Sequence, residues 1–382
     1  MRLAFYAPMK PPDHGRPSGD RRMANLLIEA LALSGQEVEL ASRFRSRDGA
    51  GDPHRQARLA DLGGRMAARL LRRYRARPAE RRPQAWFTYH LYYKAPDWLG
   101  PAVCRGLDIP YIVAEASLAP KRAGGPWDLG HRATLAALEA ASAVITLNPV
   151  DADCLPESCP VHPIPPFIDP APGRAAAAER DRHRTALCKG FALDPGLPVI
   201  ATVAMMRPGD KLASYRVLAE ALARLGDRAW QLLIVGDGPA RSEVEEAFAP
   251  LAAGRDAAGR VRFAGLIGEP ELTVLLAGCD LLAWPAINEA YGMALLEAQA
   301  AGLPVVAGRS GGVPALVESG QTGLLSDPGD VAAFAADLAR LLEDTALRDR
   351  LGRAALAKVS RDHSLEQAAV NLKRILASLG VG

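Results

Sequence analysis

The sequence has no long apolar stretch, and this absence limits the kinds of protein it can encode. No apolar run approaches the roughly 20 residues that a membrane-spanning helix needs. Residues 1–8 are too short for a secretory signal and are expected to form a first strand. With 382 residues, 49% hydrophobic and 23% charged, the chain has the length and composition of a soluble globular protein of two ordinary domains.

Cysteine is scarce, and the charges nearly balance. The five cysteines are odd in number and scattered, which favours reduced thiols in a cytoplasmic protein over a disulfide framework. A net charge of +3 is too small to indicate a nucleic-acid partner. The glycine pattern G-x-G-x-x-G is missing after the first strand, which argues against a dinucleotide-dependent dehydrogenase.

Short apolar segments alternate with helical patterns along the whole chain. Such alternation predicts mainly parallel sheets, with one doubly wound α/β unit in each half. A proline-dense segment at residues 160–172 separates the halves. Strands are expected at residues 3–7, 38–41, 85–90, 111–115 and 143–148 in the first half, and at residues 198–203, 231–236, 261–265, 281–284 and 305–307 in the second.

The stretch from Asn288 to Ala307 contains two glutamates around a predicted helix at residues 290–301. Glu289 precedes this helix and Glu297 lies within it. If both were helical, they would be about 12 Å apart at about 1.5 Å per residue. That is too far for the carboxylate pair of a retaining glycosidase, roughly 5 Å apart, but it suits two contacts with one extended ligand. The alternative is a surface helix with two solvated glutamates.

The first N–H groups of a helix have no partner within it and bind anions and hydroxyls. Here those groups belong to Tyr291, Gly292 and Met293.

This stretch resembles the signature of family 4 retaining glycosyltransferases, which have the GT-B fold. The similarity is strong from about Pro198 to the C-terminus and weaker over residues 1–166. Besides the Glu289–Glu297 stretch, it rests on Val235-Gly-Asp-Gly-Pro239, Val261-Arg-Phe-Ala-Gly265, Gly311-Gly-Val-Pro314, Gly320-Gln-Thr-Gly-Leu-Leu325 and Pro328-Gly-Asp330.

The resemblance implies an α/β protein of two Rossmann-like domains that face each other across a cleft. Residues 1–167, with a returning helix at about 363–382, would bind the acceptor, and residues 168–362 would bind a nucleotide-sugar. The implied reaction is glycosyl transfer with retention at the anomeric carbon. It needs no cofactor and no metal. The acceptor stays open between a glycan, a lipid-linked molecule and a small molecule.

The resemblance also assigns donor-binding residues. Glu297 would hold the donor ribose, and Glu289 would hold hydroxyls of the transferred sugar together with the N–H groups of Tyr291, Gly292 and Met293. Gly19 falls where the family has a glycine-rich loop near the donor phosphates, and Gly265 is a further donor-binding candidate. Gly19 could also be a loop glycine without a function.

Arg207 and Lys211 follow the predicted strand at residues 199–203, at its carboxyl end. Cations there could neutralise a diphosphate leaving group as its charge grows. The family usually places an arginine and a lysine five residues apart after this strand, whereas the spacing here is four and Met206 occupies the expected arginine position. The alternative is a pair of solvated loop cations.

The acceptor side departs from the family pattern. Many members have a histidine after the strand that contains Ile112, where this sequence has Glu115 and Ser117. His90 ends the preceding predicted strand and is a candidate for contacting sugar or acceptor, or a structural histidine. Lys121 and Arg122 are candidates for holding an anionic acceptor.

A basic amphipathic helix is expected at residues 54–82, which include ten arginines. Such a helix can lie on an anionic membrane surface, so peripheral contact with the inner face of the membrane is one interpretation. The other is a solvated face of an ordinary helix.

Two patterns resemble metal sites but are not favoured. Asp151 and Asp153 match the D-x-D motif of a different glycosyltransferase fold, yet they open a helical segment, where acidic residues favour the helix dipole. Cys154, Cys159 and His162 lack the fourth ligand of a zinc site.

Three rival functions stay open. A nucleotide-sugar 2-epimerase shares the fold and is an isomerase. A glycogen-phosphorylase-like enzyme would need a lysine placed for pyridoxal phosphate, and no pattern here announces one. A non-catalytic partner would bind a sugar nucleotide without turning it over.

Overall fold

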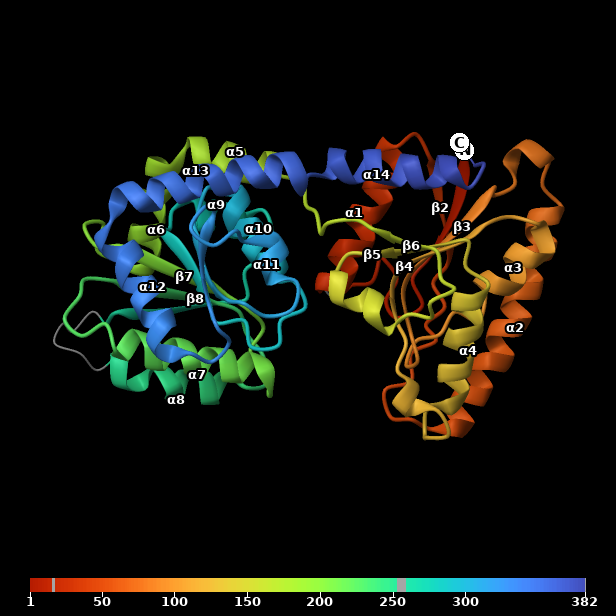
Figure 1. Ribbon diagram of the computed structural model, residues 1–382, viewed down its shortest axis with the longest axis horizontal. Helices are drawn as coiled ribbons and strands as arrows, with labels where there is room; N and C mark the ends of the chain where they lie inside the picture. Colours follow the sequence, from red (N-terminus) through yellow and green to blue (C-terminus); the bar gives the residue numbers. More distant parts are fainter. Residues whose placement is uncertain (16–17, 253–258, 382) are drawn as a thin grey trace. The chain divides into compact units, whose positions relative to one another are not determined.

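The computed structural model describes residues 1–15, 18–252 and 259–381, and these form two compact units (Figure 1). Unit 1 comprises Met1–Pro165 and Leu365–Gly382, and unit 2 comprises Pro166–Ser364. The chain therefore leaves unit 1 once and returns to it at its end. The domain boundaries expected at 167/168 and 362/363 lie two residues from these positions.

Unit 1 contains a six-stranded sheet in the order β2-β1-β3-β4-β5-β6, and all its strand pairs are parallel. The chain moves from β1 outward to β2, then returns past β1 to β3, so the direction of winding reverses between β1 and β3. In doubly wound sheets ligands bind at the carboxyl ends of the strands beside such a reversal. The strands are β1 (Arg2–Tyr6), β2 (Glu37–Ser42), β3 (Ala85–Tyr92), β4 (Tyr111–Ser117), β5 (Ala143–Thr146) and β6 (Val161–Pro163).

Helices cover both faces of this sheet (Figure 1). On one face α1 packs against α14, the helix that returns from the C-terminal end of the chain. On the other face α2 packs against α3 and α4. The elements are α1 (Gly19–Leu33), α2 (Pro53–Arg75), α3 (Gly100–Leu107), α4 (Asp128–Glu139) and α14 (Leu365–Ser378), with short 3-10 turns η1 (Ala79–Arg81), η2 (Pro120–Arg122) and η3 (Pro149–Cys154).

Unit 2 contains a second six-stranded parallel sheet in the order β12-β11-β10-β7-β8-β9. Its winding reverses between β7 and β10, which are hydrogen-bonded neighbours. The loops that follow these two strands therefore leave the sheet side by side. The strands are β7 (Val199–Val203), β8 (Gln231–Val235), β9 (Val261–Gly265), β10 (Leu281–Trp284), β11 (Val305–Gly308) and β12 (Gly323–Ser326).

The helices of unit 2 also lie on both faces of their sheet (Figure 1). One face carries α7, which packs against α8 and α12, and the other carries α10, which packs against α5, α9 and α13. The helices are α5 (Ala171–Ala178), α6 (Arg180–Phe191), α7 (Asp210–Ala223), α8 (Arg241–Ala252), α9 (Glu271–Ala277), α10 (Met293–Ala300), α11 (Val313–Leu316), α12 (Val331–Glu343) and α13 (Thr345–Asp362).

The core of each unit lies between its sheet and its helices. The fully buried large side chains include Trp86 and Tyr111 in unit 1, and Trp230 and Phe248 in unit 2. Apart from β2, β6 and β9, the strands are largely buried on both faces, as expected of parallel sheets covered by helices. This explains why they appear in the sequence as short continuous apolar runs.

The basic helix expected at residues 54–82 is shorter than predicted. The helix α2 ends at Arg75, and the 3-10 turn η1 follows after Pro78. Proline has no backbone N–H to donate and restricts the residue before it, so it cannot continue a helix. The amphipathic pattern itself is present, because Ala67, Leu70 and Tyr74 are buried while the α2 arginines are exposed.

Candidate active site

The carboxyl ends of β7 and β10 bring together two segments that lie far apart in the sequence. The loop after β7 leads into α7, and the loop after β10 leads into α10. Ile287 N–H donates a 3.0 Å hydrogen bond to the Ser214 hydroxyl on α7. The Asn288 side-chain amide donates to the Asp210 carboxylate, also at 3.0 Å. These bonds attach the loop after β10 to the first turns of α7.

Lys211, Glu289 and Trp284 form a compact group between these segments. The Lys211 ammonium makes an ion pair with Oε2 of Glu289. The Trp284 indole N–H donates a 3.0 Å hydrogen bond to the same oxygen. Lys211 Nζ also lies 5.2 Å from the Trp284 ring centroid, within the range of a cation–π contact. The cation predicted for the leaving group and the carboxylate predicted for the sugar are thus direct neighbours.

The backbone around Glu289 is held in uncommon conformations. Ala286 and Asn288 have φ values of 54° and 50°, which place non-glycine residues in the left-handed region. Glu289 N–H donates to the Ser310 hydroxyl at 3.2 Å. Such conformations cost energy and persist only where surrounding contacts enforce them, which is common at functional sites.

Gly311 fixes this loop from the other side. A Cβ added to Gly311 would lie 2.1 Å from the Glu289 carbonyl oxygen, so no other residue fits there without displacing the loop. The next residue, Gly312, donates its N–H to the Ala290 carbonyl at 2.6 Å. The loop between β11 and α11 therefore supports the loop that carries Glu289.

The helix expected at residues 290–301 begins later than predicted. The helix α10 starts at Met293, with Gly292 at its N-cap and a φ of 73° there. Ala290 is a good helix former, but the left-handed Gly292 separates Ala290 and Tyr291 from the helix. Of the predicted N–H donors, only Met293 belongs to the helix, and Tyr291 and Gly292 lie in the preceding loop. Glu297 is half-buried on α10.

Arg207 and Met206 differ in exposure. Met206 is fully buried. Its N–H donates to the Asp237 carbonyl at 3.0 Å, and a Cβ at Gly238 would lie 2.2 Å from its carbonyl oxygen. Arg207, the next residue, is exposed. Met206, at the expected arginine position, is thus part of the core. Arg207 takes no part in the contact between Lys211 and Glu289.

The two glycines predicted to approach the donor lie in different units. Gly265 ends β9 in unit 2 with a φ of 69°, and a Cβ built on it would meet nothing within 4 Å. Gly19 begins α1 in unit 1, directly after the N-cap Ser18, and space is likewise open around it. Neither is therefore required by close packing in the structure.

In unit 1, His90 and Glu115 occupy facing positions on adjacent strands. The ladder between β3 and β4 pairs Tyr89 with Ala114 and Leu91 with Ala116, so it skips both residues. Both adopt left-handed conformations, with φ values of 64° and 57°. The prediction that the strands end at these residues is wrong: each strand continues for two more residues, because the ladder resumes after a local irregularity.

Acidic groups surround this pair. His90 Nδ1 lies 3.1 Å from Asp20 Oδ1 on α1. Glu115 accepts a 2.8 Å hydrogen bond from Leu147 N–H. Burial raises the pKa of Glu115 to about 7, and the nearby carboxylates of Asp151 and Asp20 add to this, against the lowering effect of Leu147 N–H and His90.

Metal-like patterns do not assemble into a ligand set. Within residues 1–15, 18–252 and 259–381, no group of three or more histidine, cysteine, aspartate or glutamate side chains is placed to hold a metal. Asp151 lies beside the Glu115 cluster, and burial raises its pKa. All five cysteines are free thiols.

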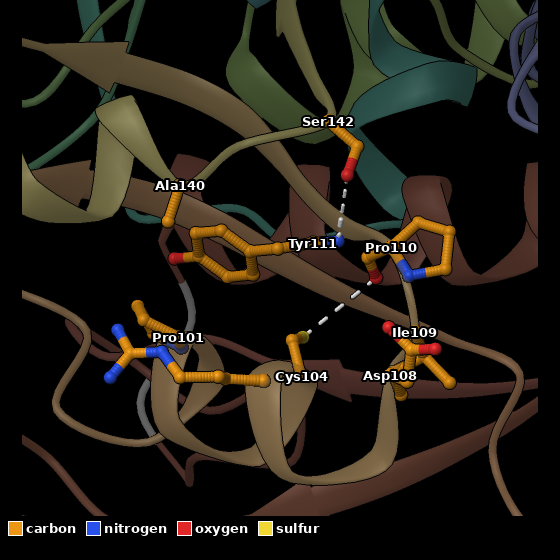
Figure 2. Close-up of a pocket in the computed structure, with 9 residues that line it drawn as sticks. Pro101, Cys104, Asp108, Ile109, Pro110, Tyr111, Ala140 and Ser142 are labelled. Carbon is orange, nitrogen blue, oxygen red and sulfur yellow. Dashed lines mark hydrogen bonds between the residues drawn. The ribbon is translucent and has the colours of Figure 1, made fainter.

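A surface pocket of unit 1 lies at the opposite end of the strands from His90 and Glu115. Figure 2 shows it between α3 and the beginning of β4, where Tyr111 N–H donates a 3.3 Å hydrogen bond to Ser142 Oγ and Cys104 Sγ lies 3.8 Å from the Pro110 carbonyl oxygen. Ligands of parallel α/β sheets bind at the carboxyl ends of the strands, so this pocket is not part of the candidate site.

Sequence reasoning missed Trp284 and Asp20. Trp284 appears in the sequence only as the last apolar residue of a buried strand, and Asp20 as an acidic residue in the first turn of a helix. Their contacts with Glu289 and His90 depend on which strands are neighbours, and a single sequence does not reveal this. The available signal for Trp284 was a tryptophan, whose indole N–H can donate a hydrogen bond, at the last residue of a strand at the ligand-binding edge.

Comparisons with known proteins find glycosyltransferases among the similar sequences. A family model described as "Glycosyl transferases group 1" matches residues 197–344, which lie in unit 2. The D-inositol 3-phosphate glycosyltransferase of Corynebacterium efficiens is 36% identical over 191 residues, 48% of this chain and 42% of that protein. The 2-deoxystreptamine glucosyltransferase of Streptomyces kanamyceticus is 31% identical over 275 residues, 70% of this chain and 65% of that protein. The matches thus span less than two thirds of each relative.

Solved structures match over nearly the full chain. Sucrose-phosphate synthase from Thermosynechococcus elongatus has a TM-score of 0.71 at 20% identity, covering 99% of both chains. Anabaena Alr3699/HepE, solved in complex with UDP-glucose, has a TM-score of 0.71 at 20% identity and covers 99% of this chain and 100% of its own. The predicted fold is confirmed: two six-stranded parallel α/β units in the GT-B class.

Proposed function

We propose that this chain, whose residues 197–344 form a domain of the glycosyl transferases group 1 family, transfers a sugar from a nucleotide-sugar donor to an acceptor hydroxyl. The observation that carries the proposal is the group of Lys211, Glu289 and Trp284 at the winding reversal of unit 2. It places a cation and a carboxylate within one contact distance, where ligands of doubly wound sheets bind. In a nucleotide-sugar, one bond joins the diphosphate to the sugar. A cation for the diphosphate and a carboxylate for the sugar hydroxyls must therefore lie close together.

The chemistry assigns each residue a role. The bond between the anomeric carbon and the diphosphate oxygen breaks, and a bond from the acceptor oxygen forms on the same face, so the configuration is retained. The acceptor proton passes to the departing phosphate oxygen. Lys211 stabilises the negative charge that develops on the diphosphate. Glu289 accepts hydrogen bonds from sugar hydroxyls, and Trp284 holds its carboxylate in place. Glu297 accepts hydrogen bonds from the ribose.

Names of related proteins support the substrate classes. One structural neighbour was solved with UDP-glucose, and the two relatives described above are named for D-inositol 3-phosphate and 2-deoxystreptamine. Both of these named molecules are small, polyhydroxylated rings. We therefore favour a uridine-type nucleotide-sugar as donor and a small polyhydroxylated acceptor over a polymer.

We also propose that transfer needs no divalent ion. Lys211 and the backbone N–H groups at the start of α10 supply positive charge to the diphosphate without a metal. Turnover that persists in EDTA would support this. Turnover that is lost in EDTA and restored by manganese would direct attention to Asp151 and Asp153.

Membrane contact is a separate proposal. No helix in the described ranges is long and apolar enough to cross a membrane. The exposed arginines of α2, including Arg58, Arg65 and Arg69, would instead attract an anionic lipid surface in the cytoplasm. Co-sedimentation with phosphatidylglycerol vesicles at low salt, lost when these three residues are changed to glutamine, would support it. Equal sedimentation of the triple variant would contradict it.

One experiment tests the proposed function most directly. The chain is screened with a panel of nucleotide-sugars by thermal shift, and the best donor is incubated with and without candidate acceptors. Glu297→Ala should weaken donor binding by about tenfold or more, since a charged hydrogen bond contributes on the order of 1.5–3 kcal/mol. Formation of the C2 epimer from the donor alone would overturn the proposal in favour of an isomerase. Donor binding without any turnover would favour a non-catalytic partner.

A further inference from the structure

Two cations of unit 1 lie against the same pair of aromatic rings. Lys94 Nζ is 5.7 Å from the Tyr93 ring centroid and 5.1 Å from that of Trp127. Arg122 Cζ is 5.2 Å and 5.1 Å from the same two centroids. The rings themselves are in edge-to-face contact at 5.8 Å. We call Lys94 and Arg122 the cation pair.

The cation pair has no counter-charge in the part of the chain that the structure describes. Neither residue forms an ion pair there, and both are half-buried. Nε of Arg122 is buried and has no hydrogen-bond partner in the structure. Contacts with aromatic faces compensate only part of the lost hydration. Two positive charges therefore lie against the same two rings, and Arg122 Nε–H still lacks a hydrogen-bond acceptor.

The turns that carry the pair are closed by their own hydrogen bonds. Lys94 lies in the turn after β3, where Ala95 N–H donates to the Tyr92 carbonyl at 2.8 Å. Arg122 ends η2, and Gly125 N–H donates to its carbonyl at 3.2 Å. The Asp128 carboxylate accepts Gly124 N–H at 2.8 Å and completes the second turn.

Asp48, in the segment after β2, joins the two turns. Its N–H donates to the Lys94 carbonyl at 2.8 Å, and its carbonyl accepts the Trp127 indole N–H at 3.2 Å. Its buried carboxylate accepts a 3.0 Å hydrogen bond from the Gln56 amide, which also donates to the Pro126 carbonyl at 2.8 Å. These hydrogen bonds thus link the turn that carries Lys94 to the segment at Pro126 and Trp127.

We propose that the cation pair binds a phosphate group carried by the acceptor. A guanidinium fork and an ammonium together satisfy several oxygens of one phosphate, and such charge-assisted bonds are strong. A bound phosphate would supply the missing counter-charge and an acceptor for the buried Arg122 Nε–H. The proposal rests on the proposed function for the word acceptor, but the anion site itself is argued from unit 1 alone.

The position of the pair fits an acceptor. Lys94, Arg122 and Asp48 follow β3, β4 and β2, so they lie at the carboxyl edge of the sheet, beside its winding reversal. Ring contacts continue from Trp127 and Tyr93 to Tyr92 at 5.7 Å, and from Tyr92 to His90 at 5.1 Å. An acceptor anchored by its phosphate would lie over these rings and point its hydroxyls toward His90.

Binding of small probes tests the proposal on the intact chain. Isothermal titration calorimetry with glucose 6-phosphate, inorganic phosphate and glucose should show binding of the two phosphates and none of glucose. Lys94→Gln and Arg122→Gln should each weaken glucose 6-phosphate binding by about tenfold or more. Arg122→Lys should lose less than Arg122→Gln. Lys373→Gln and Arg374→Gln remove the same charges from exposed positions of α14 in the same unit and should leave binding unchanged.

Two further measurements separate the outcomes. Vesicles containing phosphatidylinositol distinguish a lipid headgroup from a free sugar phosphate: capture that depends on the cation pair, without binding of glucose 6-phosphate, would assign the phosphate to a lipid-linked acceptor. Nucleotide-sugar binding, measured on every variant, reports that the chain is folded. If the chain binds a nucleotide-sugar but the cation-pair variants bind every phosphate probe as the wild type does, the phosphate-site proposal fails while the proposed function stands. If no nucleotide-sugar binds, the proposed function fails.

Discussion

Lys211 makes the contact on which the candidate site most depends. We expect Lys211→Ala to lower the turnover number by about a hundredfold to a thousandfold, because a cation placed where charge develops binds the transition state better than the bound donor. Steady-state kinetics at saturating donor checks this. Arg216→Ala is the matched control, since Arg216 is exposed on the same helix, α7. Normal turnover with only a raised Michaelis constant would make Lys211 a uniform binding contact instead.

Glu115 should make stability depend on pH. Its carboxyl has a folded pKa of about 7 against an ordinary value of 4.5. As pH rises from about 4.5 to about 7, the unfolded chain loses this proton first, so the folded state becomes relatively less stable. Glu115→Gln stays neutral in both states and should be more stable than wild type at pH 8, by about 3 kcal/mol at most, and equal to it at pH 4.

Urea unfolding at pH 4, 5.5 and 8 measures this difference. Glu29→Gln, at an exposed position of α1 in the same unit, is the control and should change stability at no pH. Equal stabilities of Glu115→Gln and wild type at pH 8 would mean that the Glu115 carboxylate is ionised at no cost in the folded chain.

Gln299 is a buried polar residue whose side chain makes no hydrogen bond in the structure. Its side chain is fully buried on α10, and neither its amide oxygen nor its amide nitrogen has a hydrogen-bond partner in the structure. Methionine has a similar shape and no strong polar group, so Gln299→Met should raise the free energy of unfolding by about 1–2 kcal/mol. Urea unfolding measures the change, with exposed Gln321→Met as the control. A loss of stability would show that a buried water satisfies the amide.

At the scale of elements, the sequence predicted the order of strands and helices well, because apolar runs bounded by glycine and proline mark them clearly. It failed where a single backbone angle decides. The left-handed Gly292 delays α10 by three residues, and the left-handed His90 and Glu115 let β3 and β4 continue beyond their predicted ends. Lys211 and Glu289 could be named from the sequence. Their mutual contact and the role of Trp284 could not, because these depend on backbone angles and on which strands are neighbours.

The loop between β11 and α11 should control the site through Gly311. Alanine there would carry its Cβ to 2.1 Å from the Glu289 carbonyl oxygen and must push the Glu289 loop away. We expect Gly311→Ala to lower kcat/KM for the donor by at least about tenfold, because small misplacements of catalytic groups are costly. Gly320→Ala is the control: its φ of 81° imposes a similar backbone strain, but its Cβ meets nothing within 4 Å. Equal losses in both variants would attribute the effect to strain alone.

At the scale of the whole molecule, unit 1 is completed by the last helix of the chain. The helix α14 packs on α1 and buries six apolar side chains: Leu365, Ala368, Ala369, Leu372, Ile375 and Leu376. The four larger ones contribute roughly 1.5–3 kcal/mol each when buried, a sum comparable to the roughly 5–15 kcal/mol that stabilises a typical domain. The sequence indicated a returning helix only through its resemblance to a family, since periodicity does not say which unit a terminal helix joins.

Truncation after Ser364 should therefore unfold unit 1 and spare unit 2. The cut leaves intact the contacts that close unit 2, in which His363 Nδ1 lies 2.7 Å from the Pro166 carbonyl oxygen and Ile168 N–H donates to the His363 carbonyl at 2.9 Å. Differential scanning calorimetry of residues 1–364 should show a smaller unfolding enthalpy than the full chain, while nucleotide-sugar affinity stays within about twofold, because the domain at residues 197–344 is untouched. Truncation after Leu379 removes only residues beyond α14 and should preserve the full enthalpy.

If the 1–364 chain unfolds with undiminished enthalpy, unit 1 has a core of its own that does not require α14. If donor affinity falls together with unit 1, residues outside unit 2 contribute to the donor site, and Gly19 at the start of α1 is the first to test.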